Sequence, residues 1–212
     1  MKRLFILLLL IGPVFCYGQL DSENEKKKDE VRTVFGNTKP SGGHIGFTSK
    51  GFYINGQQGY GNGVELAVGF GRKFNFGFSG YGLITDVKSS YSDVSGVDYF
   101  YDLGYGGFYL EPIIGSIWPI HLSFPVTLGL GGVFQSQYRA YNYNWDTMSY
   151  GEDYAMFYIA DIGANIELNL FKFLRLAGGI NYRFTSDVNL QGTPKQQFSG
   201  LGANITLKLG WF

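Results

Sequence analysis

The sequence has little of what disulfide-bonded, nucleic-acid-binding or helical membrane proteins depend on. Its 212 residues include one cysteine, Cys16, and two histidines, His44 and His121. A single cysteine excludes a disulfide within the chain and argues against a disulfide-stabilised secreted domain. The formal net charge is zero, so the composition gives no reason to expect a nucleic-acid partner.

The amino-terminal residues have the pattern of an export signal followed by a polar arm. A basic start and an apolar run from Leu4 to Phe15 precede small residues that end at Gly18. We predict a signal peptide at 1–18, which is removed, and a flexible charged periplasmic arm at 19–40. Acylation of Cys16 in a lipoprotein is an alternative, although bulky residues precede it. The apolar run is shorter than the ~20 residues of a spanning helix, and no run of that length follows.

Alternation between apolar and polar residues is most regular between Tyr154 and Phe184. On each side of a short corner at 171–173, one face is continuously apolar and the other carries charged residues, amides and glycines. A period of two predicts strands, and the short corner predicts an antiparallel hairpin. An apolar face opposite a charged face is typical of a transmembrane strand with lipid outside and a polar interior. A soluble sandwich would give the same alternation in one hairpin.

The remainder of the chain from Ser41 supplies enough strands for a barrel. Alternation predicts eight strands, at residues 43–54, 63–71, 74–85, 99–114, 121–134, 154–170, 174–184 and 199–212. The fourth alternates poorly, so we expect a β-bulge at Gly106–Gly107 and leave the frame of Glu111 open. Pro125 interrupts the fifth strand, since proline cannot donate a ladder hydrogen bond. The pattern predicts an all-β fold, an eight-stranded antiparallel transmembrane β-barrel at 41–212.

The connections and the aromatic residues predict where this barrel lies. Short connections alternate with longer polar ones, as in outer-membrane barrels, which have periplasmic turns and outside loops. Two aromatic girdles are expected, one at the turn side (Phe74, Trp118, Phe171, Phe173, Trp211) and one toward the loops (Tyr53, Tyr60, Tyr99, Tyr138, Tyr154). The predicted location is the outer membrane, with outer-membrane lipid as a partner.

Four segments carry a resemblance to a known group of proteins: GYGG at 104–107, HLSFPVTLGLGG at 121–132, IELNLFKFLRLAGGINYRF at 166–184 and FSGLGANITLKLGWF at 198–212. The chain resembles a family of small outer-membrane β-barrel proteins of the Bacteroidota over most of residues 41–212. This family has no assigned biochemical activity, so the resemblance implies a fold and a location rather than a reaction. The chain departs from the usual carboxyl end because Trp211, and not Phe212, lies in the lipid-facing frame.

Charged residues on the predicted inner face suggest a filled interior. These are Glu65, Asp161, Glu167, Arg175, Arg183 and Lys208. Because an unpaired charge in a narrow interior is costly, we predict a paired network in which Asp161 meets Arg183 and Glu167 meets Arg175. Eight strands enclose just enough room for side chains or one small ligand. We therefore predict a plugged lumen.

Residues with chemical potential are few. His121 and Ser123, two residues apart on one face, could serve a lipid-modifying barrel enzyme, but a structural role at the barrel mouth is the simpler interpretation. Asp98, Asp102, Asp146 and Asp153 lie near the loops without the spacing of a calcium site, and we predict no metal and no cofactor.

The long loop at 135–153 is the candidate recognition segment. Its aromatic residues, interleaved with small polar ones, are Tyr138, Tyr141, Tyr143, Trp145 and Tyr150. Such a composition is typical of recognition surfaces, and an interfacial aromatic belt is the alternative. We predict a non-enzymatic barrel with a structural or recognition role through its extracellular loops, for an extracellular ligand or protein. A narrow pore for small solutes is the alternative function, and the oligomeric state is left open.

Overall fold

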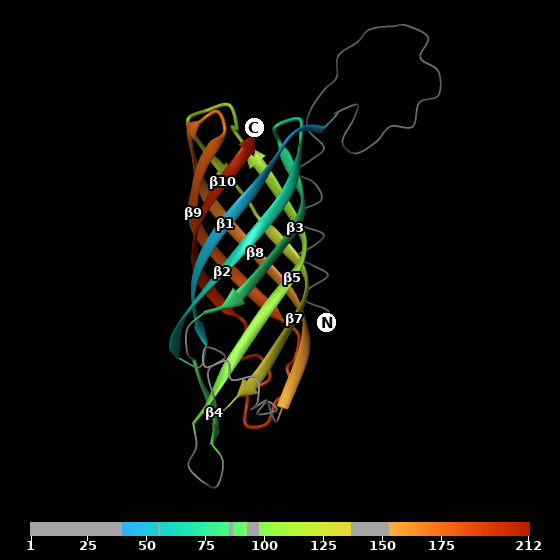
Figure 1. Ribbon diagram of the computed structural model, residues 1–212, viewed down its shortest axis with the longest axis vertical. Helices are drawn as coiled ribbons and strands as arrows, with labels where there is room; N and C mark the ends of the chain where they lie inside the picture. The colour runs from blue at the N-terminus through green and yellow to red at the C-terminus, as the bar shows by residue number, and fades with distance from the viewer. Residues whose placement is uncertain (1–39, 55, 85–86, 93–97, 137–152) are drawn as a thin grey trace, which may run out of the picture. The chain divides into compact units, whose positions relative to one another are not determined.

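The computed structural model describes residues 40–54, 56–84, 87–92, 98–136 and 153–212, which form antiparallel strands joined by turns (Figure 1). The predicted signal peptide and nearly all of the predicted arm lie outside these residues. No described helix is long and apolar enough to cross a membrane. The strands are β1 (Pro40–Ile54), β2 (Gln57–Phe70), β3 (Phe74–Leu83), β4 (Lys88–Ser92), β5 (Asp98–Ile114), β6 (Ile120–Ser123), β7 (Val126–Ser136), β8 (Asp153–Phe171), β9 (Leu174–Thr185) and β10 (Gly200–Trp211).

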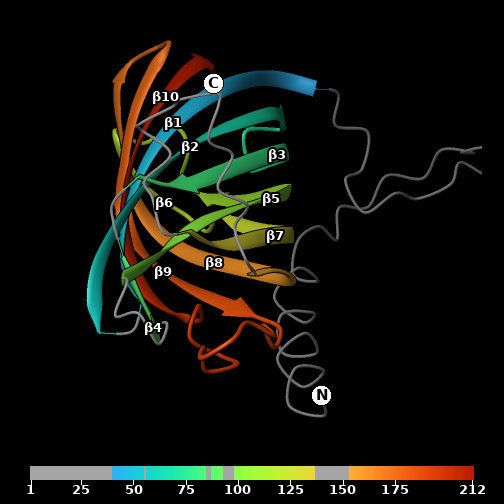
Figure 2. The ribbon, with the colours of Figure 1, turned by 60° about the horizontal axis from the view of Figure 1, so that its bottom comes forward.

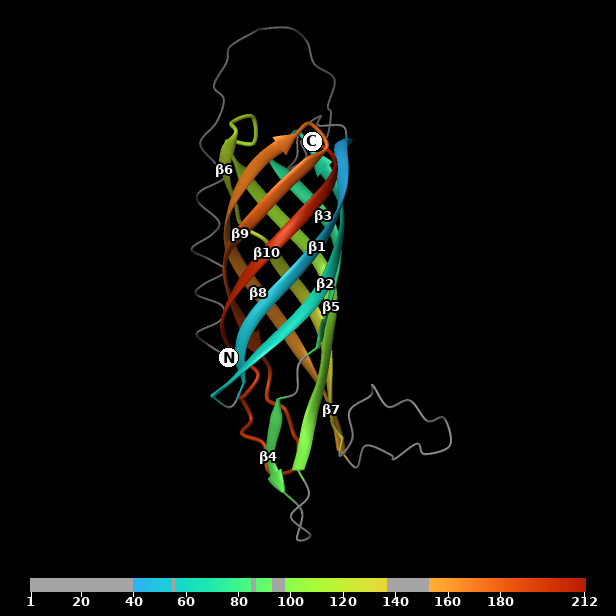
Figure 3. The ribbon, with the colours of Figure 1, turned by 60° about the vertical axis from the view of Figure 1, so that its left-hand side comes forward.

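Eight of these strands form a ring in which each pairs with two neighbours (Figures 2 and 3). The ring runs β3–β2–β1–β10–β9–β8–β7–β5, and β5 pairs again with β3. The short strand β6 pairs with both β5 and β8 and so continues the position of β7 in the ring. Phe124 and Pro125 separate β6 from β7. β4 lies outside the ring and pairs with β5. The predicted all-β fold with eight antiparallel strands is confirmed.

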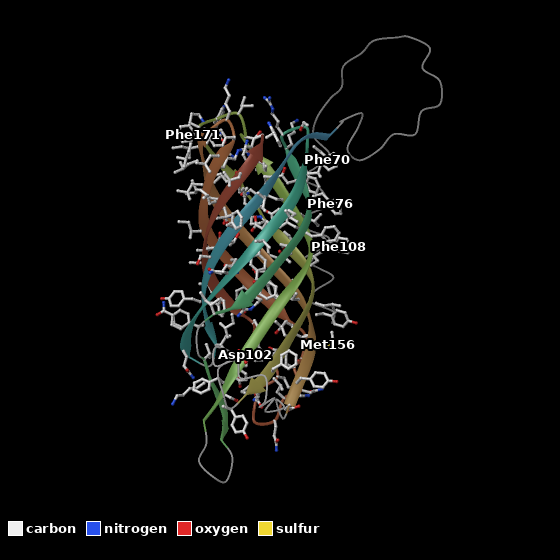
Figure 4. All side chains as sticks on the ribbon, in the orientation of Figure 1. Phe70, Phe76, Asp102, Phe108, Met156 and Phe171 are labelled. Carbon is white, nitrogen blue, oxygen red and sulfur yellow. The ribbon has the colours of Figure 1, made fainter. Side chains whose placement is uncertain are left out.

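The predicted alternation of faces is also confirmed. In β2, Val64 and Leu66 are exposed on the outer surface, whereas Glu65 and Ala67 are buried inside the ring. The outer surface is apolar over neighbouring strands, as the stacked rings of Phe76 and Phe108 illustrate (Figure 4).

One expectation about β5 is wrong. Its pairings with β3 and β7 pass through Gly106 and Gly107 without a register shift, so there is no β-bulge. Alternation is weak in the sequence because large tyrosines such as Tyr105 point inward while small Gly106 faces outward. Gly107 is needed for close strand approach, since a Cβ there would lie 2.1 Å from the carbonyl oxygen of Leu128. The regular frame places Glu111 inside.

The short turns and the longer connections lie at opposite ends of the ring. The turns at 71–73, 115–119 and 172–173 share one end, which we call the turn end, and β4 lies at the other, the loop end (Figure 1). Phe171 lies at the turn end in Figure 4, and Met156 and Asp102 lie toward the loop end. Trp118, Phe171, Phe173 and Trp211 are exposed at the turn end, as predicted. Tyr99 was wrongly assigned to the loop-side girdle, because its side chain is 2% exposed.

The loop end is uneven in height. β8 has 19 residues and β9 has 12, and the last pair between them joins Ile159 to Thr185. Among the described strands, the residues of β8 before Ile159 pair with β7 and not with β9. The strands β5, β7 and β8 therefore form a wall that extends past the rim on one side (Figure 1).

Candidate functional site

The interior near the turn end is organised around one lysine. Lys208 of β10 forms ion pairs with both Glu111 of β5 and Glu167 of β8, and all three side chains are buried. The side-chain amide of Asn75 donates to Glu111 Oε2 at 2.7 Å. A single ammonium group thus bridges two carboxylates from β5 and β8, the strands on either side of β6 and β7, which keeps either carboxylate from being an isolated buried charge.

The Glu167 carboxylate contacts three further polar side chains. Ser123 Oγ donates to Glu167 Oε1 at 2.8 Å, and His121 Nε2 lies 2.9 Å from Glu167 Oε2. The Nη1 atom of Arg175 lies 3.6 Å from Glu167 Oε2. The predicted ion pair between Glu167 and Arg175 is therefore present, but the two residues are not register partners: Glu167 is opposite Ala177 and Arg175 is opposite Asn169, two residues away. The guanidinium of Arg175 also lies 3.9 Å from the ring centroid of Phe212.

A second ion pair lies in the middle of the interior. Lys50 Nζ donates to Asp161 Oδ2 at 2.7 Å, and the Tyr105 hydroxyl donates to the same oxygen at 2.7 Å. Asn181 donates to the other oxygen of Asp161, also at 2.7 Å. The Lys50 ammonium also lies 3.6 Å from the ring centroid of Tyr81.

The predicted ion pair between Asp161 and Arg183 is wrong, although the two residues are register partners. Among the described residues, the cation paired with Asp161 is Lys50. Arg183 Nε donates instead to the carbonyl oxygen of Phe198 at 2.6 Å, and its guanidinium lies 4.4 Å from the ring centroid of Phe52. Its long side chain therefore reaches contacts nearer the loop end.

The remaining buried carboxylate, that of Glu65, is hydrogen-bonded to neutral side chains. Glu65 Oε1 accepts from Thr48 Oγ1 at 2.8 Å and from the Tyr81 hydroxyl at 2.9 Å. Thr48 and Thr206 are also joined through their hydroxyls, at 2.9 Å. Side chains from β1, β2, β3 and β10 thereby connect across this part of the ring.

Sequence reasoning missed two of the buried charges, Lys50 and Glu111. With them, the described interior holds four acids (Glu65, Glu111, Asp161, Glu167) and four bases (Lys50, Arg175, Arg183, Lys208). Lys50 shares a frame with His44 and Thr48, and this alternation in β1 was the available signal. Glu111 was missed because the expected bulge left its frame open.

The space among these polar groups is small. The cavity that Lys50, Glu65, Tyr81 and Asp161 help to line has a volume of about 10 Å³. That is roughly the room required by one water molecule. The side chains therefore fill this level of the interior.

An apolar cluster fills the interior at the loop end. The connection after β9 folds inward, and its Val188, Leu190 and Phe198 are buried against residues of the ring such as Val133 and Phe157. The Phe157 and Phe198 rings stack with centroids 6.2 Å apart.

Hydrogen bonds hold this connection in place. The hydroxyls of Tyr101 and Thr193 lie 2.9 Å apart, and Gln135 donates to the Gln191 carbonyl at 3.3 Å. The sequence predicts a polar loop here. Its three apolar residues, Val188, Leu190 and Phe198, were the missed signal that this segment packs into the loop end of the barrel.

His121 and Ser123 are brought together on one carboxylate rather than on each other. Their residues are 3% and 0% exposed, and each contacts Glu167. A serine nucleophile needs a base that takes its proton, and the base must be reachable by substrate. The Ser123 hydroxyl donates to Glu167 and not to His121, so the two residues belong to a buried hydrogen-bond network.

The predicted loop-recognition residues Tyr138, Tyr141, Tyr143, Trp145 and Tyr150 lie outside the described residues. The two strands that precede and follow this segment in the chain, β7 and β8, carry an exposed apolar face. Phe134 of β7 and Tyr154, Met156 and Tyr158 of β8 are each more than half exposed, and the Phe134 and Tyr154 rings stack at 6.2 Å. Within the described ranges, no group of three or more His, Cys, Asp or Glu residues could hold a metal ion.

Comparisons with known proteins bear on the fold. No protein-family model and no curated protein matches the sequence. The chain is similar to the crystal structure of Neisserial surface protein A (NspA), with 8% identity over 82% of this chain and 96% of that one, at a TM-score of 0.50. It also matches Ail, the attachment invasion locus protein of Yersinia pestis, solved with the heparin analogue sucrose octasulfate, with 13% identity over 80% of this chain and 96% of Ail, at a TM-score of 0.44. The architecture is that of small outer-membrane β-barrels. The Bacteroidota family stays a prediction.

Proposed function

We propose that this chain is an integral outer-membrane β-barrel without enzymatic activity, whose lumen is filled and whose role is recognition or structural support at the cell surface. The carrying observation is the interior, where side chains fill the centre and the 186–199 connection covers the loop end. A pore needs a continuous wet path, and an enzyme needs a reachable nucleophile. Neither has support among the described residues.

The outer surface supports the membrane placement. Large apolar side chains such as Leu66, Phe78 and Ile166 are more than half exposed to the outside of the ring, while charges are buried within it. Soluble proteins arrange these residues the other way round, whereas lipid-facing strands are apolar outside and polar inside. The aromatic residues at the turn end match a membrane interface.

The loop end supports recognition. The wall of β5, β7 and β8 extends past the last β8–β9 pair and presents Phe134, Tyr154, Met156 and Tyr158 on its outer face. Tyrosine, phenylalanine and methionine are enriched in protein interfaces. Strands hold these side chains in fixed positions, which lowers the entropic cost of binding.

Cysteine labelling in intact cells tests the placement. Lys172→Cys lies on a turn and Lys195→Cys lies on the covering connection, and both lysines are exposed. An impermeant maleimide added outside should label Lys195→Cys at once and Lys172→Cys only after the outer membrane is permeabilised. Cys16→Ser in both variants removes the other thiol. Immediate labelling of Lys172→Cys would contradict the orientation.

Binding tests the recognition role. Purified protein in lipid nanodiscs is applied to an array of surface glycans and matrix proteins, together with a Tyr154→Ser/Met156→Ser/Tyr158→Ser variant. The proposal expects a binding signal that the variant loses while its thermal unfolding is unchanged. A signal that the variant retains would argue against the wall, and replacing Tyr141, Tyr143 and Trp145 then tests the neighbouring loop.

A further inference from the structure

The turn end carries exposed cations that form no ion pair with another side chain among the described residues. Arg72 and Lys73 lie on the β2–β3 turn and Lys172 lies on the β8–β9 turn, and all three are exposed. None of the three forms an ion pair with another described residue. The described side-chain carboxylates of this end, Glu111 and Glu167, are buried and already bound to Lys208, and the terminal carboxylate of Phe212 is one further negative charge at this end.

The loop end differs in this respect. There Lys195 Nζ lies 3.9 Å from Asp187 Oδ2, so an exposed cation has an exposed acidic partner. Among the described residues, Lys195 therefore differs from the three cations of the turn end in having an acidic partner.

The turns that carry the three cations share one end of the ring, where exposed aromatic rings also lie. Lys172 lies between Phe171 and Phe173, whose rings stack with centroids 5.7 Å apart. The backbone amide of Gly210 donates to the Phe173 carbonyl at 2.9 Å, which ties this turn to β10 and its exposed Trp211. The amide of Ile113 donates to the Lys73 carbonyl at 2.7 Å, which fixes the other turn.

Outer-membrane barrels carry girdles of aromatic residues at both membrane interfaces, where the lipid headgroups lie. A cation flanked by such rings is held where lipid phosphates are found. Lysine and arginine near an anionic lipid surface add to membrane affinity, and their effect falls off within a Debye length.

The separation of the two turns decides which phosphate source fits. β1 and β10 lie between the β2–β3 turn and the β8–β9 turn in the ring. The cations therefore point to different parts of the rim and do not converge on one small anion. A surface made of many anionic headgroups can engage both turns at once.

We propose that Arg72, Lys73 and Lys172 form a binding rim for anionic phospholipid headgroups of the leaflet at the turn end. This inference rests on the proposed membrane placement. It adds the class of lipid that the protein selects and the residues that select it.

Lipid selectivity of the inserted protein tests the rim. The protein is reconstituted in phosphatidylcholine vesicles, and spin-labelled phosphatidylglycerol and phosphatidylcholine are compared for the fraction immobilised on the protein. Each cation is expected to contribute up to roughly a fivefold preference for the anionic lipid. The wild type should prefer phosphatidylglycerol, and Arg72→Gln/Lys73→Gln/Lys172→Gln should show almost no preference.

A matched control and a competitor complete the experiment. Lys195→Gln removes an exposed cation from the other end and should keep the preference. Equal selectivity in the wild type and the triple variant would overturn the rim. Loss of the preference on adding inorganic phosphate at constant ionic strength would also overturn it, in favour of a soluble-anion site.

The two proposals fail in different ways. Failure of the wild type to enter neutral phosphatidylcholine vesicles, seen as no heat-shifted band on a gel, would reject the membrane placement. Insertion without lipid selectivity would reject the rim alone.

Discussion

The two ends of the interior are filled by opposite chemistry. Near the turn end, Lys208 bridges Glu111 and Glu167, and neutral donors complete the carboxylates. Near the loop end, Phe198 and Val188 pack against apolar residues of the ring. Buried charges need specific partners, because removal of one leaves another unpaired, whereas apolar packing depends on volume. The charged end should therefore respond sharply to single changes and the apolar end in proportion to the volume lost.

The largest effect is expected from Lys208→Ala. Two buried carboxylates would lose their shared cation, at a cost of about 3–5 kcal/mol in the free energy of unfolding. Urea unfolding of the protein folded in lipid vesicles measures it. Lys195→Ala, which removes an exposed cation, should change the same quantity by less than about 0.5 kcal/mol. Similar losses in both variants would mean that burial of the charge is unimportant.

Phe198→Ala tests the apolar end. Truncating a buried phenylalanine leaves a cavity and costs about 3 kcal/mol. Because the partners are apolar, Phe198→Leu should recover most of this loss, and the same unfolding experiment reports both variants. If Phe198→Leu were as damaging as Phe198→Ala, the ring contacts of Phe198 with Tyr101 and Phe157 would matter more than the buried volume.

A smaller effect is expected from Arg175→Ala. Glu167 retains Lys208, His121 and Ser123, and Arg175 Nη1 is 3.6 Å away, so the loss should be about 1–2 kcal/mol, below that of Lys208→Ala. Heat-induced mobility shifts on a gel and urea midpoints should both stay close to the wild type. A loss as large as that of Lys208→Ala would show that Arg175, and not Lys208, is the main partner of Glu167.

The smallest effect is expected from Thr48→Val. The change removes the hydrogen bonds that the Thr48 hydroxyl makes with Glu65 Oε1 and with the Thr206 hydroxyl, while Glu65 Oε1 keeps its bond from the Tyr81 hydroxyl. The cost should be about 1 kcal/mol or less in the urea experiment. A loss of several kcal/mol would indicate that the hydroxyl chain from Thr206 through Thr48 supports the wider network.

Much of this fold follows from alternation alone. In β2 from Val64 to Val68, and over most of β8, apolar residues at alternate positions face outward, so these faces could be predicted. Alternation failed in β5, where tyrosines point inward and glycines outward, because residue size there follows the space available and not the polarity of the two sides.

The pairing of charges could not be predicted in the same way. Register identifies which backbone positions are opposite, and Asp161 and Arg183 are indeed register partners. Long side chains then contact residues that are not their register partners. Arg183 reaches the carbonyl oxygen of Phe198, and Lys50 of β1 reaches Asp161 of β8. Contacts across the interior join strands that are distant in sequence, and a single sequence carries no direct signal for them.

Conductance in a planar lipid bilayer tests the filled interior most directly. Purified full-length protein, shown to be folded by its heat-shifted band, is inserted at a voltage that opens no lipid defects. The account predicts a silent bilayer for the wild type, because the polar side chains and the covering connection leave no continuous water path. Steady, ion-selective conductance from the folded wild type would contradict it.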